Sequence, residues 1–352
     1  MKKNVMVILC DQFRADYISC YNENSPVKTP NIDALVEDGV MFQNAVTASP
    51  VCAPGRACMM TGRYVSDHGV WTNDVAFRDG IEFLPQRMTD NGYACAAFGK
   101  LHHYPAKDSK GFDYAWQMEE SRLGEEDDYY KYLHSIHKEV NGVFPDRDKF
   151  IYSEEEYYEN QIAIRAIDFI ESVKDEKNFF TWVSFQGPHG PLDPPEIDYN
   201  VDLSLIEEPL EPDFVPPCEV TKYRRARGND CNFEEIRKYR ESYVKLIEHI
   251  DNQVARIVEY LKENNLYENT VIMFSTDHGD MCGDYRMWQK GPFLYSNQLE
   301  VPLIIANHQD LPKNVKTNML TGNIDIAKTA LSLAGDNNEL GYSKDIAKMY
   351  ND

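Results

Sequence analysis

The sequence lacks any apolar run that approaches a membrane-spanning helix, which needs about 20 residues. It has no C-x-x-C pair among its eight cysteines and no internal repeat. Its start, Met1-Lys2-Lys3 followed by apolar residues 5–10, has too short an apolar run for a signal peptide and no small-residue cleavage site. Without a secretory context, free thiols in a reducing compartment are favoured over disulfides. These absences together predict a soluble, cytoplasmic protein with no membrane partner.

Positive charge is also scarce, with 36 Lys and Arg against 58 Asp and Glu and a formal net charge of −22. This balance argues against nucleic acid and anionic membrane surfaces as partners. If the substrate is an anion, basic side chains must therefore be concentrated in a pocket. With 352 residues, of which 42% are hydrophobic and 12% aromatic, the chain is globular and long enough to bury a large core.

Short apolar segments alternate with helical patterns along the chain. The continuous apolar run over residues 5–10 is typical of a strand buried on both faces of a parallel sheet. Further strand-like runs cover 40–46, 94–98, 179–185, 271–276 and 301–306, and helical patterns cover 29–39, 83–91, 157–173, 233–264 and 324–333. This alternation predicts an α/β fold with a mostly parallel sheet.

We predict one domain over residues 1–352, with two segments that depart from the alternating pattern. Residues 117–160 are acidic and Tyr-rich, which is typical of an insertion over the surface. Residues 192–232 are Pro-rich and too long for an ordinary connection, which indicates a functional loop. Each segment is a candidate for selecting the substrate, and a solvated surface is the alternative for both.

Polar side chains capable of chemistry follow four of the predicted strands. In parallel sheets, ligands bind beyond the carboxyl ends of the strands, so these side chains are expected at one edge. They are Asp11, Lys100 with His102, His189, and Asp277 with His278. The coincidence at four strand ends is what indicates a site, because each group alone is also typical of a turn or an exposed loop.

Residues 49–63 have the pattern of a helix entry. Pro54 is tolerated in the first turn, and Gly62 suits the C-terminal cap. Cys52 is then expected at or just before the helix N-terminus, which favours negative charge. Arg56 follows one turn later, where its guanidinium could meet the same anion. A buried, inert thiol beneath a surface arginine is the alternative.

The remaining candidates divide by the chemistry of their side chains. Asp11 with Asp277 and His278 offers oxygen and nitrogen ligands for a divalent cation. An Asp after a strand is also common as a turn or cap residue. Asn73 is either a turn residue or a pocket contact. The cations and imidazoles that could bind an oxyanion and move protons are Lys100, His102, His189 and Lys290, whereas we interpret His68, His103 and His134 as structural or exposed.

Several motifs, in order, resemble those of the sulfatase family. Residues 49–57 followed by residues 61–64 are similar to its first signature, C-x-P-x-R with T-G-R. Residues 99–102 (Gly-Lys-Leu-His) resemble its second signature, and residues 276–291 resemble its metal-binding segment. The resemblance extends over roughly residues 5–345.

The resemblance implies an alkaline-phosphatase-like α/β fold in which Cys52 is oxidised to formylglycine, whose hydrate is the nucleophile. It also implies that Arg56 steadies the formylglycine and the metal. The ligands implied for one divalent metal ion, usually calcium, are Asp11, Gln12, the modified Cys52, Asp277 and His278.

The same resemblance implies that Lys100, His189 and Lys290 grip the sulfate. His189 or Lys290 would protonate the leaving oxygen, and His102 would help deprotonate the second hydroxyl so that sulfate is expelled. General chemistry supports the same roles, because a metal ion polarises the nucleophile and cations stabilise the negative charge that develops during transfer.

The sequence departs from many sulfatases at its metal motifs. Asp11-Gln12 and Asp277-His278 are similar to the choline sulfatase and phosphonate monoester hydrolase branch, and Asn73 matches a substrate-site Asn of that branch. The nitrogen ligand makes Mn²⁺ more plausible than in an all-oxygen site. Lys100 and His102 favour a sulfatase over a phosphonate hydrolase. Gly55 stands where the first signature usually has Ser, and the usual C-terminal antiparallel subdomain is expected to be short or absent.

Three hypotheses about function follow from the sequence. The leading one is a sulfatase that acts on an aryl, sugar or small-alcohol sulfate after a maturase has converted Cys52. The second is a phosphonate monoester or phosphodiester hydrolase with the same site. The third is an inactive, binding-only relative whose Cys52 stays a thiol. A homo-oligomer is compatible with each.

Overall fold

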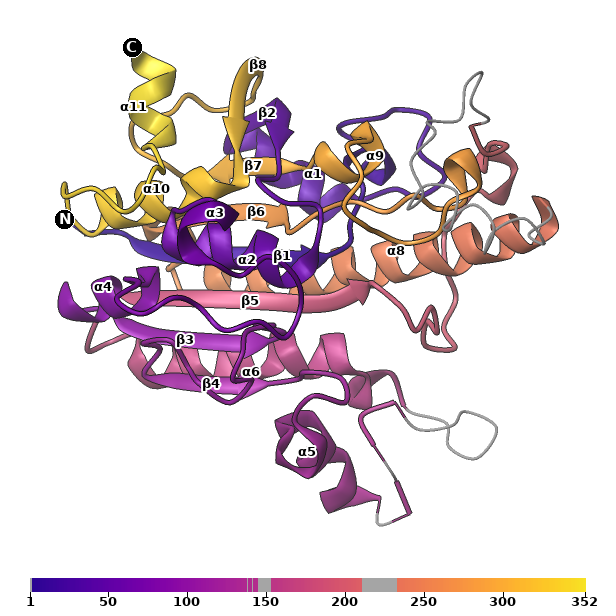
Figure 1. Ribbon diagram of the computed structural model, residues 1–352, viewed down its shortest axis with the longest axis horizontal. Coiled ribbons are helices and arrows are strands. Elements are labelled where there is room, and N and C mark those ends of the chain that lie inside the picture. Colours follow the sequence, from indigo (N-terminus) through magenta and orange to yellow (C-terminus); the bar gives the residue numbers. More distant parts are fainter. Residues whose placement is uncertain (1, 138, 141, 145–152, 211–232) are drawn as a thin grey trace.

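The computed structural model describes residues 2–137, 139–140, 142–144, 153–210 and 233–352. One eight-stranded sheet runs through the middle of the molecule in the order β4-β3-β5-β1-β6-β7-β2-β8 (Figure 1). All neighbours pair in parallel except β7, which is antiparallel to both β6 and β2. The strands are β1 (Asn4–Asp11), β2 (Gly39–Val46), β3 (Ala94–Gly99), β4 (Tyr114–Gln117), β5 (Phe179–Pro188), β6 (Thr270–Thr276), β7 (Leu303–Ala306) and β8 (Val315–Gly322).

Helices cover both faces of this sheet (Figure 1). One face packs against α1 (Pro30–Glu37), α6 (Tyr158–Val173) and α8 (Phe233–Glu263). The other packs against α2 (Cys52–Thr61), α4 (Leu84–Asp90), α10 (Ile326–Leu333) and α11 (Ile346–Asn351). The shorter helices are α3 (Val65–His68), α5 (Asp128–Ile136) and α9 (Ser296–Leu299). The predicted α/β architecture with a mostly parallel sheet is therefore confirmed.

The central strand β1 shows why continuous apolar runs form this sheet. Met6 and Ile8 belong to the core beneath α6 and α8, whereas Val5 and Val7 belong to the opposite core. Every residue of β1 is buried, because side chains alternate between two covered faces. On α8, the predicted apolar stripe is also buried, from Tyr243 to Leu261.

The sequence pattern does not predict the two edge strands, β4 and β8. β8 lies at one edge of the sheet and alternates half-buried with exposed residues, so Lys316 and Asn318 interrupt the apolar signal. β4 lies at the other edge, has four residues and buries only Trp116 and Gln117. Edge strands need less apolar surface than central ones, which is why both were missed.

The two segments that depart from the alternating pattern have different outcomes. Within the acidic segment, the structure buries Glu119, Asp127 and Tyr129, which corrects the expectation of a surface insertion for these residues. In the Pro-rich segment, a short 3₁₀ turn covers Leu203–Leu205, and residues 211–232 lie outside the described part of the chain.

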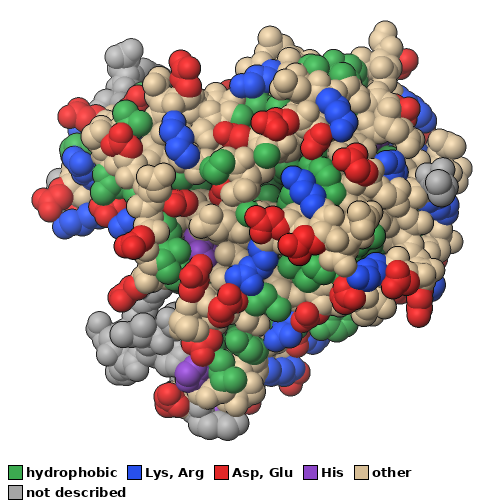
Figure 2. All heavy atoms as spheres, turned by 180° about the vertical axis from the view of Figure 1, so that it is seen from behind, with side chains coloured by type: hydrophobic (Ala, Val, Ile, Leu, Met, Phe, Trp, Pro, Cys, Tyr) green, Lys and Arg blue, Asp and Glu red, His purple; other side chains and the backbone are tan. Residues whose placement is uncertain are grey.

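Seen from behind, the molecule shows acidic and basic side chains interspersed rather than gathered into one patch of either sign (Figure 2). A search of the described helices finds none both long and apolar enough to span a membrane.

Candidate active site

The four strands that end in polar side chains are neighbours in the sheet, in the order β3, β5, β1 and β6. They run parallel, so Lys100, His189, Asp11 and Asp277 meet at one edge. β2 runs in the same direction because the antiparallel β7 separates it from β6. Its carboxyl end therefore delivers α2 to that edge.

α2 begins at Cys52, as the sequence pattern indicates. Val51 is its extended N-cap, and Gly62 ends it in the left-handed region with a φ of 64°. The Oδ1 atom of Asn73 accepts a hydrogen bond of 3.2 Å from the amide of Ala53. Asn73 thus satisfies a free amide at the helix start, beside Cys52, which gives it a structural contact at the site.

Gly55 has a local structural reason. A Cβ atom at this position would lie 2.9 Å from the carbonyl oxygen of Ser49 and 3.2 Å from that of Asp277. The first of these distances is shorter than van der Waals contact allows. The absence of a side chain lets α2 approach the end of β6 closely.

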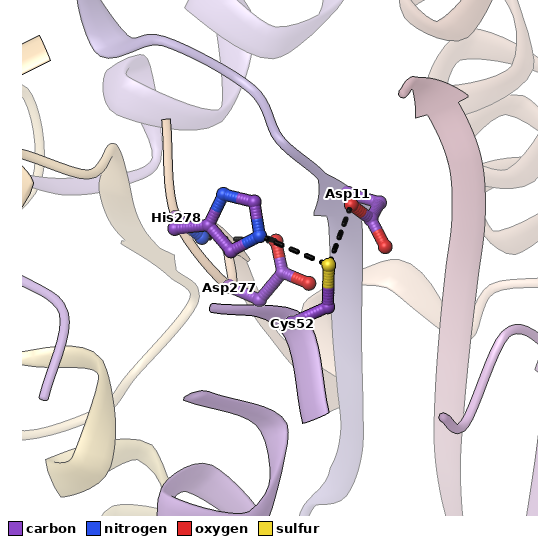
Figure 3. A group of neighbouring side chains, drawn as sticks. All are labelled: Asp11, Cys52, Asp277 and His278. Carbon is purple, nitrogen blue, oxygen red and sulfur yellow. Dashed lines mark hydrogen bonds and ion pairs between the residues drawn. The ribbon is translucent and has the colours of Figure 1, made fainter. Parts of the chain in front are cut away.

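Cys52 lies among three potential metal ligands (Figure 3). Its sulfur is 3.1 Å from Nε2 of His278 and 3.7 Å from Oδ1 of Asp11. One donor atom from each of Asp11, Cys52, Asp277 and His278 lies within 4.8 Å of the others, and all four residues are buried. The Nδ1 atom of His278 is 2.8 Å from the carbonyl oxygen of Gly279, which leaves Nε2 facing the sulfur.

Gln12 lies beside this cluster. Its backbone has a φ of 67°, and its amide donates a 3.0 Å hydrogen bond to Oδ1 of Asp277. Its Nε2 donates to the carboxylate of Asp280, which also accepts a 2.6 Å hydrogen bond from the hydroxyl of Tyr239. Its Oε1 is buried and has no hydrogen-bond partner among the described residues. A buried acceptor without a donor fits a cation ligand, so the residues present suit a metal ion.

Arg56 is fully buried and ties the strand ends together. Its guanidinium donates to Asp277 at 2.8 Å and to Asp11 at 3.2 Å. It also donates to the Lys100 carbonyl at 2.6 Å and the Ser184 hydroxyl at 2.7 Å. Burial alone would raise the pKa of Asp11, but Lys100 and Arg56 help hold it well below its ordinary value.

Lys100 lies between two carboxylates. Its Nζ atom is 2.8 Å from Oδ2 of Asp11 and 2.6 Å from Oε1 of Glu120. Burial would lower the pKa of Lys100, but these two carboxylates raise it above its ordinary value, so the ammonium stays charged. The Nε2 atom of Gln186 also donates to Glu120 at 2.9 Å and is 3.2 Å from Nδ1 of His189.

His102 and His189 are kept neutral by the same surroundings. Burial, followed by the charge of Lys100, lowers the pKa of His189 to about 3 and that of His102 well below its ordinary value. Both ring nitrogens of His102 are buried without a partner in the described parts of the chain. Lys290 is half-buried, and its charge also lowers the pKa of Asp11 and of His189.

Glu119 shapes the loop that carries His102. Its carboxylate accepts hydrogen bonds from the amides of Leu101 at 2.7 Å and His102 at 2.9 Å, and it pairs with Arg122 at 3.2 Å. His102 has a φ of 58°, which is uncommon for a residue with a side chain. The buried carboxylate therefore stabilises a strained backbone directly beside Lys100.

Several residues that contact the predicted ones were not found from the sequence, among them Ser184, Gln186, Asp280, Glu119 and Glu120. Ser184 lies within a predicted strand, and Asp280 follows another predicted strand. A polar residue inside a buried strand is the pattern that could have predicted Ser184. Glu119 and Glu120 gave no such signal, because they begin an acidic run.

Among the histidines interpreted as structural, His68 has its Nε2 at 3.3 Å from the sulfur of Cys58.

The α/β fold and the clustered donors are those of an alkaline-phosphatase-like architecture, and comparisons with known proteins specify the family. A sulfatase family model matches residues 3–336. The arylsulfatase of Clostridium perfringens is 29% identical over 350 residues, covering 90% of this chain and 71% of that protein. The choline-sulfatase of Rhizobium meliloti is 27% identical over 363 residues, covering 95% and 68%. The chain belongs to the sulfatase family. Its arylsulfatase and choline-sulfatase relatives support the prediction of a sulfuric ester hydrolase.

Solved structures agree in fold. The phosphonate monoester hydrolase SpPMH from Silicibacter pomeroyi superimposes with a TM-score of 0.82 at 22% identity. The match covers 97% of this chain and 76% of that structure. The predicted resemblance to the family, including relatives from the choline sulfatase and phosphonate monoester hydrolase branch, is confirmed.

The carboxyl group of Glu159 on α6 is buried next to the carboxyl end of β5. It accepts a 2.8 Å hydrogen bond from the amide of Gly187, and burial raises its pKa to about 8. A folded-state pKa above the unfolded value stabilises the fold fully below the unfolded value, and this contribution is lost as pH rises through about 8. Glu159→Gln should therefore match the wild type near pH 5 but become more stable by up to about 4 kcal/mol above pH 8.

Urea denaturation at several pH values measures this difference. The matched control is Glu176→Gln, because Glu176 is exposed just beyond the end of the same helix. A constant difference between the Glu159→Gln variant and the wild type across this pH range would show that Glu159 is not buried as a neutral acid.

Proposed function

We propose that this protein hydrolyses a sulfate ester with a formylglycine made from Cys52 and one divalent metal ion. The observation that carries the proposal is the position of Cys52. It begins a buried helix among three potential metal ligands, while Lys100 and His189 follow neighbouring strands on the adjoining side. A nucleophile, a cation site and an anion site thus share one edge of the sheet.

Hydrated formylglycine at residue 52 would supply a geminal diol as the nucleophile toward the sulfur atom of the ester. Arg56 supports the position of residue 52 because its ion pairs with Asp11 and Asp277 fix these two carboxylates. Because all three of its guanidinium nitrogens already donate hydrogen bonds to protein acceptors, we assign Arg56 to positioning the site rather than to substrate contact.

The metal ion would be held by oxygen, nitrogen and formylglycine ligands and would polarise the nucleophile and the ester oxygens. The ligands proposed are Asp11, Gln12, the modified Cys52, Asp277 and His278. Ca²⁺ suits the oxygen donors, and the imidazole of His278 makes Mn²⁺ the alternative. The buried, unpartnered Oε1 of Gln12 supports its place in this set.

The anion site consists of Lys100, His189 and Lys290, with Asn73 at its border. Their charges and hydrogen bonds stabilise the sulfate oxygens in the transition state. His189 or Lys290 donates a proton to the leaving oxygen, and the low pKa of His189 favours Lys290 for this role. His102 accepts the proton of the second hydroxyl as sulfate leaves, a role that suits a neutral imidazole with unpartnered ring nitrogens.

The alcohol portion of the substrate is proposed from the names of the relatives. They include an arylsulfatase, a choline-sulfatase and an iduronate 2-sulfatase. We accordingly propose an aryl, small-alcohol or sugar sulfate, a maturase as the partner that converts Cys52, and a single sulfatase-type domain over residues 1–352. A cytoplasmic location and a homo-oligomer stay hypotheses of the same kind.

A second function is supported by the metal motif and by the fold match to a phosphonate monoester hydrolase. A phosphonate monoester or a phosphodiester is a monoanion like a sulfate ester, so the same site could bind it. Comparing the two substrate classes at equal metal concentration separates the functions. A binding-only protein with an unmodified Cys52 is the third alternative.

The direct test of the nucleophile is Cys52→Ala in protein made together with a maturase. Loss of the attacking group should lower sulfate release from an aryl sulfate by more than about a thousandfold. Ion chromatography of released sulfate measures it. Cys58→Ala is the matched control, since Cys58 is a buried thiol on the same helix and should leave activity within a few-fold. Undiminished release by Cys52→Ala would overturn the mechanism.

The metal proposal predicts a change in thermal stability. Ca²⁺ or Mn²⁺ at about a hundred times its dissociation constant should stabilise the protein by about 2.7 kcal/mol, seen as a higher melting temperature. Asp277→Asn should lose this increase, because it removes a charged ligand. Asp310→Asn, at an exposed carboxylate, should retain it. Equal increases in both variants would contradict the assigned ligands.

A further inference from the structure

We propose that Glu120 makes the anion site discriminate by charge. Its carboxylate weakens the binding of doubly charged sulfate more than it weakens the binding of a singly charged ester. This inference rests on the proposed function, because it takes Lys100 as a sulfate ligand. It adds a specificity-determining residue that lies outside the sequence motifs, in the acidic segment 117–160.

The geometry begins with Lys100, which has a carboxylate on each side. Asp11 belongs to the proposed metal cluster, and its side chain is fully buried. Glu120 is the second partner, at 2.6 Å, with 22% of its side chain exposed. An incoming anion must therefore share Lys100 with the carboxylate of Glu120.

Glu120 also contacts the other side of the anion site. Its Oε1 accepts the 2.9 Å hydrogen bond from Gln186 and lies 3.8 Å from Nδ1 of His189. Lys100 and His189 are two of the three residues proposed to grip the ester, and the charge of Glu120 lies next to both. Burial would raise the pKa of Glu120, but Lys100 and Arg122 lower it to about 2, and the carboxylate is charged at neutral pH.

The backbone holds Glu120 in this position. Its φ is 57°, in the left-handed region that residues with side chains rarely adopt. The preceding Glu119 is fully buried and anchored to the amides of Leu101 and His102. Strain of this kind persists only where the surrounding contacts impose it. The loop therefore directs the Glu120 carboxylate toward Lys100 rather than leaving it in solvent.

The reaction changes the charge that Glu120 faces. Water and a sulfate monoester, R–O–SO₃⁻, give an alcohol, SO₄²⁻ and one proton, with cleavage of the ester S–O bond and formation of a new one. The Coulomb energy between a carboxylate and a bound anion is proportional to the anion's charge. Repulsion by Glu120 is thus about twice as large for the sulfate product as for the ester, which favours product release.

The test compares two non-hydrolysable probes, inorganic sulfate as the dianion and methanesulfonate as a monoanion of similar shape. Isothermal titration calorimetry on metal-loaded protein gives both dissociation constants. Glu120→Gln should tighten sulfate binding about tenfold and methanesulfonate binding about threefold, since the first factor is the square of the second. Glu126→Gln is the control, because it removes the same charge where the carboxylate pairs with exposed Lys131.

Glu120→Asp keeps the charge and should bind sulfate within about twofold of the wild type. The proposal is overturned if Glu120→Gln binds sulfate no more tightly than the wild type, or if it tightens both probes equally. It is also overturned if Glu120→Asp tightens sulfate as much as Glu120→Gln does. Failure of the proposed function would appear separately, as no sulfate released from any ester by matured wild-type protein.

Discussion

The buried guanidinium of Arg56 connects the four adjacent strands on which the site is built. It donates to Asp11 in β1, to Asp277 after β6, to Ser184 in β5 and to the carbonyl of Lys100 after β3. One side chain on α2 thereby fixes the carboxyl ends of four adjacent strands. Taking such a charge out of water is costly, and only a complete set of acceptors compensates for it. The close approach of α2 to β6 at Gly55 places Arg56 within reach of them.

The charged and polar side chains around Arg56 form two groups, one on each side. On one side, carboxylates, an imidazole and the orphaned oxygen of Gln12 form a site suited to a cation. On the other, Lys100, His189 and Lys290 make up the proposed anion site. Asp11 belongs to both, because it contacts Cys52 through one oxygen and Lys100 through the other. A sulfate ester between the two groups would have its oxygens near positive charge and its sulfur beside residue 52.

Much of this arrangement could be predicted from the sequence, since parallel strands bring their carboxyl ends to one edge and apolar runs mark the strands. The helix entry at Cys52 was visible in Pro54 and Gly62, and α8 in its apolar stripe. Glu119 and Glu120 could not be predicted, because an acidic run resembles a solvated surface. Their positions depend on β4, a four-residue edge strand that pairs with β3 and leads into the chain segment beside Lys100. Such long-range pairing leaves no periodic pattern.

The chemistry assigned to this site depends on what residue 52 is in the mature protein. Mass spectrometry of the peptide that contains residue 52, from protein made in cells that contain the maturase, measures this directly. The account predicts the mass of formylglycine or its hydrate at residue 52, with Cys58 in the same peptide or its neighbour still a thiol. A thiol alone at residue 52 in that material would contradict the account and favour a binding-only protein.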